Sequence, residues 1–175
     1  MTTTNGNGAV EERQRLVTWK VPITDQRQIT ALSGLEYLQH LLDTGRQPPI
    51  GALLGFQLVQ IAPGSAVFTG TPADYHYNPI GVVHGGFAAA VLDSALGCSI
   101  HTTLKAGLAY TTIELKVNYV RPLLETTGIV TCRGAVIHAG TRVATAEARL
   151  TDTQGKLYAH GSTTCLIFPA DRQSR

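Results

Sequence analysis

Hydrophobic residues recur along this chain first with a helical period and then with an alternating one. Over residues 25–44, leucine and isoleucine return every three or four positions, which predicts an amphipathic helix that ends at Gly45. The stretch that follows, to residue 72, predicts two strands joined by a turn at Pro63-Gly64.

The middle of the chain holds its longest apolar region, and the pattern changes after it. From about Gly85 to Ile100, small and apolar residues are interrupted by a single ionised side chain, Asp93, and this predicts a long helix that other elements enclose. The later segments alternate between apolar and polar positions, which predicts four strands. These strands cover residues 112–120, 128–140, 142–152 and 156–168.

The first of these four strands shows the alternation most clearly. Apolar and aromatic side chains fall on one face and polar side chains on the other, as expected for a strand with one covered face. The apolar face holds Ile113, Leu115, Val117 and Tyr119, and the polar face holds Glu114, Lys116 and Asn118.

These elements predict an α+β fold, in which an antiparallel sheet wraps around one long central helix and an extra helix precedes it. The chain has 175 residues, enough for one domain with a core. We expect a flexible N-terminal tail over 1–24, a single domain over 25–168 and a C-terminal tail over 169–175.

Composition narrows the function classes. Charged residues make up 15% of the chain and the formal net charge is +2, with basic residues scattered, so a nucleic-acid partner is not expected. The three cysteines lie far apart, and the histidines lack metal-ligand spacing, which argues against disulfides and a metal site. No secretory signal or membrane-spanning run is found, so a cytoplasmic location is expected.

The lone carboxylate of Asp93 is the strongest functional signal. An unpaired charge in a helix built for burial costs several kcal/mol, roughly, unless it is compensated. Asp93 could cap a second short helix or lie on a narrow solvated stripe. Otherwise it lines a cleft and acts as a nucleophile or as a general base for water.

The start of the central helix reads His84-Gly85-Gly86. Two glycines allow close approach of a ligand, and free N–H groups at a helix start favour a developing oxyanion, although the glycines could also serve helix packing. His84 could be a core histidine or could orient a substrate carbonyl. Asn78 could cap a turn or could hold a water or a carboxylate.

The stretch "NPIGVVHGGFAAAVLDSALG" resembles the hotdog-fold acyl-CoA thioesterases of the PaaI and 4-hydroxybenzoyl-CoA thioesterase group. The similarity covers roughly residues 51–168. It implies hydrolysis of an aromatic or medium-chain acyl-CoA to free acid and coenzyme A, with no cofactor. By this resemblance Asp93 attacks or activates water, and the Gly85 N–H polarises the thioester carbonyl.

The resemblance also assigns supporting roles. His84, Gly86 and Asn78 are expected to position the substrate, and Thr112 to hold the water. The expected contacts with the phosphates of coenzyme A come from Arg121, Thr141 and Arg142. One departure is Gly97, because relatives with a glutamate at the acidic position often carry a hydroxyl residue there.

The fold implied by the resemblance forms its site between two subunits, so we expect a homodimer or a homotetramer built from two dimers. The expected partner is the acyl-CoA substrate, without nucleic acid or membrane. Two other functions stay open: a hotdog hydratase acting on enoyl thioesters, and a non-catalytic acyl-CoA sensor.

Overall fold

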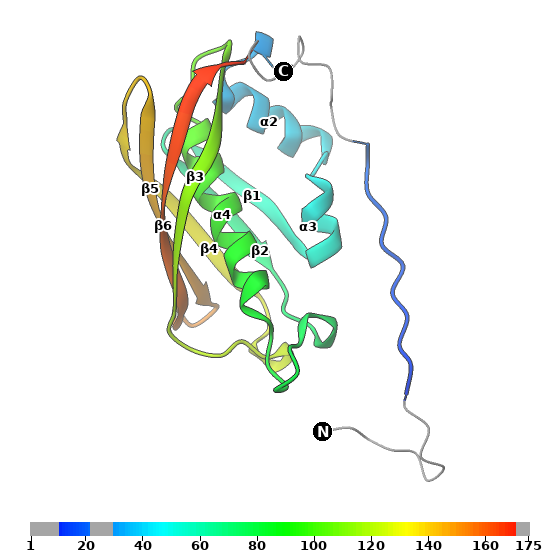
Figure 1. Ribbon diagram of the computed structural model, residues 1–175. Helices are drawn as coiled ribbons and strands as arrows, with labels where there is room; N and C mark the ends of the chain where they lie inside the picture. Colours follow the sequence, from blue (N-terminus) through cyan, green and yellow to red (C-terminus); the bar gives the residue numbers. More distant parts are fainter. Residues whose placement is uncertain (1–10, 22–29, 171–175) are drawn as a thin grey trace.

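A computed structural model describes residues 11–21 and 30–170, and it confirms the predicted α+β hotdog fold. Figure 1 shows a long sheet that curls around one central helix, α4. The helices are α2 (Gly34–Thr44), α3 (Pro49–Leu54) and α4 (Gly85–His101). The strands are β1 (Phe56–Ala62), β2 (Ser65–Gly70), β3 (Leu108–Tyr119), β4 (Val130–Ala139), β5 (Val143–Asp152) and β6 (Leu157–Pro169).

All neighbouring strands of the sheet are antiparallel, in the order β1-β2-β4-β5-β6-β3. The core lies between the concave face of this sheet and α4, where Val91, Leu92, Ala95 and Leu96 are fully buried. A helix that is apolar on nearly every side must be enclosed in this way. The strands β1 and β3 are left at the two edges.

Strand β3 contains a β-bulge that the alternation of the sequence did not predict. Thr112 pairs with Cys165 and Glu114 pairs with Thr164, so Ile113 has no partner across the strand pair. The extra residue shifts the side-chain phase, because successive residues of a strand point to opposite faces. The prediction that Ile113 shares a face with the inward residues was therefore wrong: Leu115 and Val117 pack against the core, whereas Ile113 is exposed.

The helix predicted over residues 25–44 begins later than expected, at Gly34. Residues 25–29 lie outside the described residues, and the helical residues at 30–31 are interrupted before Ser33. Ser33 and Glu36 form a reciprocal capping box that starts α2. Gly34 lies directly against the backbone of His101, where a Cβ atom would be 1.8 Å from the carbonyl oxygen.

Helix α3 was not predicted, because the pattern of residues 49–72 indicated only strands. Pro49 occupies the first helical position, and Gly55 ends the helix with φ = 70°. Both residues favour these places in a helix, but six residues are too few to show a helical period.

None of the helices in the described part of the chain has the length and hydrophobicity that a bilayer crossing requires.

Candidate active site

His84 caps the start of α4 with its own side chain. Its Nδ1 atom accepts a hydrogen bond of 2.9 Å from the Gly86 N–H, and this bond commits the Gly86 donor. Among the described residues, no acceptor is found for the Gly85 N–H. The helix start therefore presents one free backbone donor, Gly85, where the helix dipole also favours negative charge.

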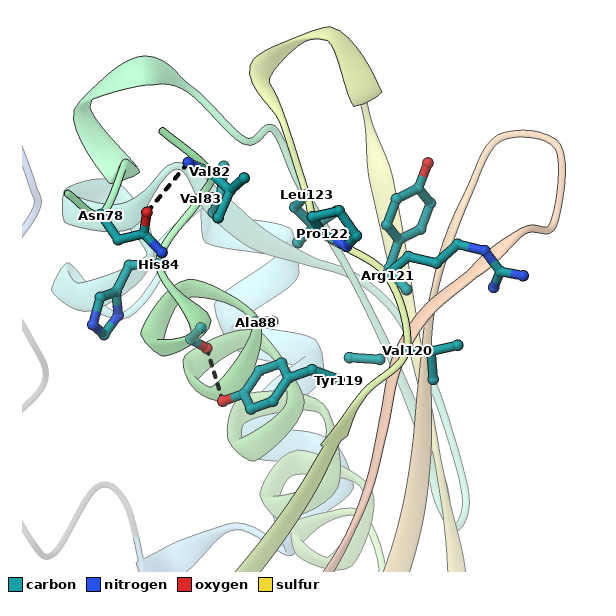
Figure 2. Close-up of a pocket in the computed structure, with 13 residues that line it drawn as sticks. Asn78, Val82, Val83, His84, Ala88, Tyr119, Val120, Arg121, Pro122 and Leu123 are labelled. Atoms are coloured by element: carbon teal, nitrogen blue, oxygen red, sulfur yellow. Dashed lines mark hydrogen bonds between the residues drawn. The ribbon is translucent and has the colours of Figure 1, made fainter. Parts of the chain in front are cut away.

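Asn78 builds the turn that leads to this helix start. Its side-chain oxygen accepts hydrogen bonds from the N–H groups of Ile80 and Val82, at 3.1 and 3.2 Å. The turn-capping role considered for Asn78 is thus present. Its amide nitrogen is left for another partner, and Figure 2 shows this nitrogen on the side of His84.

A cavity of about 370 Å³ opens beside the helix start. Figure 2 shows the side chains that surround it, which come from the loop before α4, the end of β3 and the residues after β3. It is lined by Asn78, residues 82–85, Ala88, residues 119–123 and residues 158–159. The structure thus brings four of the predicted residues, Asn78, His84, Gly85 and Arg121, to one cavity.

Asp93 lies outside this cavity, further along α4, and it meets Thr112 there. The Thr112 hydroxyl donates a hydrogen bond of 3.1 Å to Asp93 Oδ1. The bulge at Ile113 is what turns Thr112 to the inner face of β3. The hydroxyl is placed where it could hold a carboxylate or a water that the carboxylate activates.

Asp93 has no oppositely charged partner within ion-pair distance among residues 11–21 and 30–170. Its titratable neighbours are held neutral: burial, with a smaller contribution from the charge of Asp93, raises the pKa of Cys98 to about 12. Burial likewise raises the pKa of Tyr110 well above its ordinary value. In the described part of the chain, the Thr112 hydroxyl is thus the hydrogen-bond partner of a half-buried carboxylate.

Gly97 has a structural reason in this chain. A Cβ atom at this position would lie 2.8 Å from the Tyr110 hydroxyl, so the glycine allows the phenol to lie against α4. Tyr110 and Thr112 point to the same face of β3, next to Gly97 and Asp93 respectively. The hydroxyl beside Asp93 therefore comes from the neighbouring strand, from Thr112.

The predicted residues for coenzyme A do not come together within one subunit. Arg121 lines the cavity and donates a hydrogen bond of 2.6 Å to the Leu157 carbonyl. Thr141 and Arg142 lie in the turn between β4 and β5, at the opposite end of the sheet. The Arg121 N–H donates to the Tyr158 carbonyl and the Arg142 carbonyl accepts from the Ile167 N–H, so nine residues of β6 separate the two ends, roughly 30 Å.

Two residues that the sequence did not single out also hold the helix start. The Tyr119 hydroxyl donates a hydrogen bond of 3.1 Å to the Gly85 carbonyl, which Figure 2 shows as a dashed line. His76 accepts the His84 N–H on its backbone carbonyl, at 2.7 Å. The alternation of β3, which turns Tyr119 inward, could have identified Tyr119 as a site residue, whereas no local sequence pattern pointed to His76.

Within residues 11–21 and 30–170, no three His, Cys, Asp or Glu side chains gather as a metal site would require.

The sequence is similar to known proteins over this site. Residues 80–159 match the model of the thioesterase superfamily, and the match includes the helix start, Asp93 and Thr112. A Pasteurella multocida protein, PM0788, whose name marks it provisionally as an esterase, is 29% identical over 80 residues. That alignment covers 46% of this chain and 56% of the relative, so the chain spans about half of the relative's length.

Solved structures share the fold over most of their length. A point variant of the phenylacetic acid degradation protein PaaI from Thermus thermophilus is 30% identical, with a TM-score of 0.62 over 68% of this chain and 98% of the other. The thioesterase HI1161 from Haemophilus influenzae is 20% identical, with a TM-score of 0.67 over 81% of this chain and 94% of the other. The second similarity is one of fold alone.

Proposed function

We propose that this chain, which belongs to the thioesterase superfamily, hydrolyses an acyl-CoA thioester to a free acid and coenzyme A. The observation that carries the proposal is the placement of Asp93. Its carboxylate is partly buried, accepts one hydrogen bond from Thr112 and has no ion-pair partner in the described part of the chain. Such a group is free to attack a thioester or to take a proton from water.

The second part of the chemistry is a donor for the thioester carbonyl. As a nucleophile adds to the carbonyl carbon, negative charge develops on the oxygen, and a fixed N–H group stabilises it. Among the described residues, the Gly85 N–H is the donor of the helix start for which no acceptor is found. Collapse of the tetrahedral intermediate then expels the coenzyme A thiolate. Attack by Asp93 itself would add an acyl-enzyme anhydride step, which water hydrolyses.

One subunit cannot bring both groups to the same carbonyl. Gly85 and Asp93 are eight residues apart in α4, which corresponds to about 12 Å along the helix axis. A donor and a nucleophile that act on one carbonyl are separated by roughly 5 to 7 Å, even with a water between carboxylate and carbon. We therefore propose that Asp93 of one subunit acts with Gly85 of a second subunit.

The free edge of the sheet supports this arrangement. Strand β3 runs over 12 residues at the edge, and it exposes Ile113 and Tyr119, each 57% accessible. A long edge strand with exposed apolar side chains is suited to pairing with another chain. Antiparallel pairing of two β3 strands about a twofold axis would set the two α4 helices antiparallel, so that Asp93 of each approaches the helix start of the other.

The test is release of free thiol from a panel of aryl, short, medium and long acyl-CoAs. We expect wild-type turnover on at least one aromatic or medium-chain member. Asp93→Asn is expected to lower kcat by about 10² to 10⁴, without lowering the thermal midpoint, because the amide oxygen can still accept from Thr112. The matched control is Asp43→Asn, which neutralises an exposed carboxylate on α2. Asp93→Asn turnover equal to wild type would refute the assignment.

A further inference from the structure

We infer that the N-terminal segment 11–21, here called the arm, positions the start of α4 through a stack of side chains that begins at Arg15. The inference deepens the proposed function, on which its kinetic readout rests. Figure 1 shows the arm as an extended blue segment running past α3, away from the sheet. Arg15 and Tyr75 act as positioning residues, because neither touches the reacting groups.

Polar contacts fasten the arm to three places on the domain. Arg13 pairs with Asp74, and Lys20 donates to the Thr44 carbonyl at 3.0 Å. Arg15 donates to the carbonyls of Ala52 and Leu53, at 2.7 and 2.9 Å. These two carbonyls lie at the C-terminal end of α3, where free carbonyls and the helix dipole favour a cation.

From Arg15, a continuous series of cation–π, edge-to-face and tilted ring contacts, here called the stack, leads to the first turn of α4. The guanidinium carbon lies 4.1 Å from the centre of the Tyr75 ring. The Tyr75 and His76 ring centres are 4.3 Å apart, and the His76 and Phe87 ring centres are 4.6 Å apart. Phe87 is buried and belongs to the first turn of α4, two residues after Gly85. Displacement of Arg15 therefore removes the outer support of the whole stack.

His76 links the stack to the helix start a second time. Its backbone carbonyl accepts the His84 N–H, and its Nδ1 accepts the Ala73 N–H at 3.0 Å. A displacement of His76 as a whole would thus move His84, whose side chain caps α4, and with it the Gly85 N–H. This geometry gives the arm a path of direct contacts to the proposed oxyanion donor.

The stack also requires a neutral His76, since Nδ1 is already an acceptor. Burial lowers the pKa of His76, and the positive charge of Arg15 lowers it further. The nearby Leu54 backbone and the Asp74 carboxylate act in the opposite direction. Removal of the Arg15 charge therefore makes His76 easier to protonate, so the stack would loosen at a higher pH than in the wild type.

Arg15→Gln is the test, with Glu12→Gln as the matched control, since Glu12 is an exposed arm residue without a hydrogen bond in the described residues. The single tryptophan of the chain, Trp19, lies in the arm and reports its docking by fluorescence anisotropy. For Arg15→Gln we expect lower anisotropy, faster hydrogen exchange at the amides of residues 84–87 and a kcat about tenfold lower with KM within about twofold. The acid limb of the pH profile should move to higher pH, and Arg15→Lys should recover part of kcat.

Two results would overturn the inference. One is an Arg15→Gln variant with released Trp19 but unchanged exchange at residues 84–87, kcat and pH profile. The other is a variant that leaves the anisotropy and the exchange unchanged. If the wild type cleaves no acyl-CoA in the panel, the proposed function fails, and the exchange measurement alone decides on the arm.

Discussion

A site shared between two subunits makes a quantitative prediction for mixtures of inactive variants. Gly85→Pro removes the proposed oxyanion donor with little backbone cost, because proline is favoured at the first helical position. The preceding His84 already has φ = −58° and ψ = 136°, the conformation that a residue before proline prefers. Loss of one such donor costs about 10² to 10³ in kcat. The companion variant is Asp93→Asn.

Each variant alone should keep about 1% of wild-type activity or less. In a random equimolar mixture half of the dimers are mixed, and each mixed dimer has one site with both changes and one site with neither. The mixture should therefore recover about one quarter of wild-type activity, at least twentyfold more than either variant alone.

Subunits would be co-expressed or exchanged, the mixed dimers counted by native mass spectrometry, and thiol release measured on the preferred acyl-CoA. Gly85→Ala is the control, since it keeps the N–H and adds only a Cβ atom 3.0 Å from the exposed Tyr119 ring. It should stay far more active than Gly85→Pro. Mixed dimers that are present in the expected number but recover no activity would place both groups in one subunit and refute the reasoning.

Two further predictions follow from the surroundings of Asp93 and from the far end of α4. A hydrogen bond to a charged group contributes about 1.5 to 3 kcal/mol. Thr112→Val should therefore lower kcat roughly 10- to 100-fold, while Thr112→Ser keeps a kcat near that of the wild type. Equal turnover of the two variants would show that the hydroxyl has no role. Burial lowers the pKa of His101 to about 4. Between about pH 6.5 and pH 4, the unfolded chain therefore binds a proton at His101 that the folded chain does not. The free energy of unfolding should fall by an amount on the order of 3 kcal/mol as the pH drops through that window. Denaturant unfolding at pH 7 and pH 4.5 should show this loss for the wild type and a smaller one for His101→Phe, which keeps a ring between Tyr37 and Tyr110; an equal loss in both proteins would contradict it.

The long elements were predictable because their signals are local and repeated. The apolar run from Gly85 and the alternation of the later strands needed only the helical and strand periods. The short helix α3 gave no such signal, since its six residues contain too few turns, and proline and glycine at its ends also suit a turn. The later start of α2 depends on the close contact of Gly34 with His101, far away in the sequence.

The sequence singled out residues of the candidate site, but it did not give their arrangement in space. The structure places Asn78, His84, Gly85 and Arg121 around one cavity, and it sets Thr112 beside Asp93. The distance of about 12 Å between Gly85 and Asp93 follows from helix geometry. That this distance is too long for two groups acting on one carbonyl follows only from the geometry of the reacting atoms. The role of Arg15 depends on contacts across 60 residues of sequence, which no local pattern records.

The bulge at Ile113 has a consequence for comparing this chain with its relatives. Because one residue of β3 is skipped in the pairing with β6, the alternation of inward-facing side chains changes phase at the bulge. Odd-numbered residues face inward near Tyr119, and even-numbered residues face inward near Thr112. Counting backward in steps of two from Tyr119 selects Ile113 and Thr111 and misses the hydroxyl that meets Asp93. A relative without the bulge would carry its equivalent hydroxyl one position out of step, so an alignment without a gap would hide a shared site.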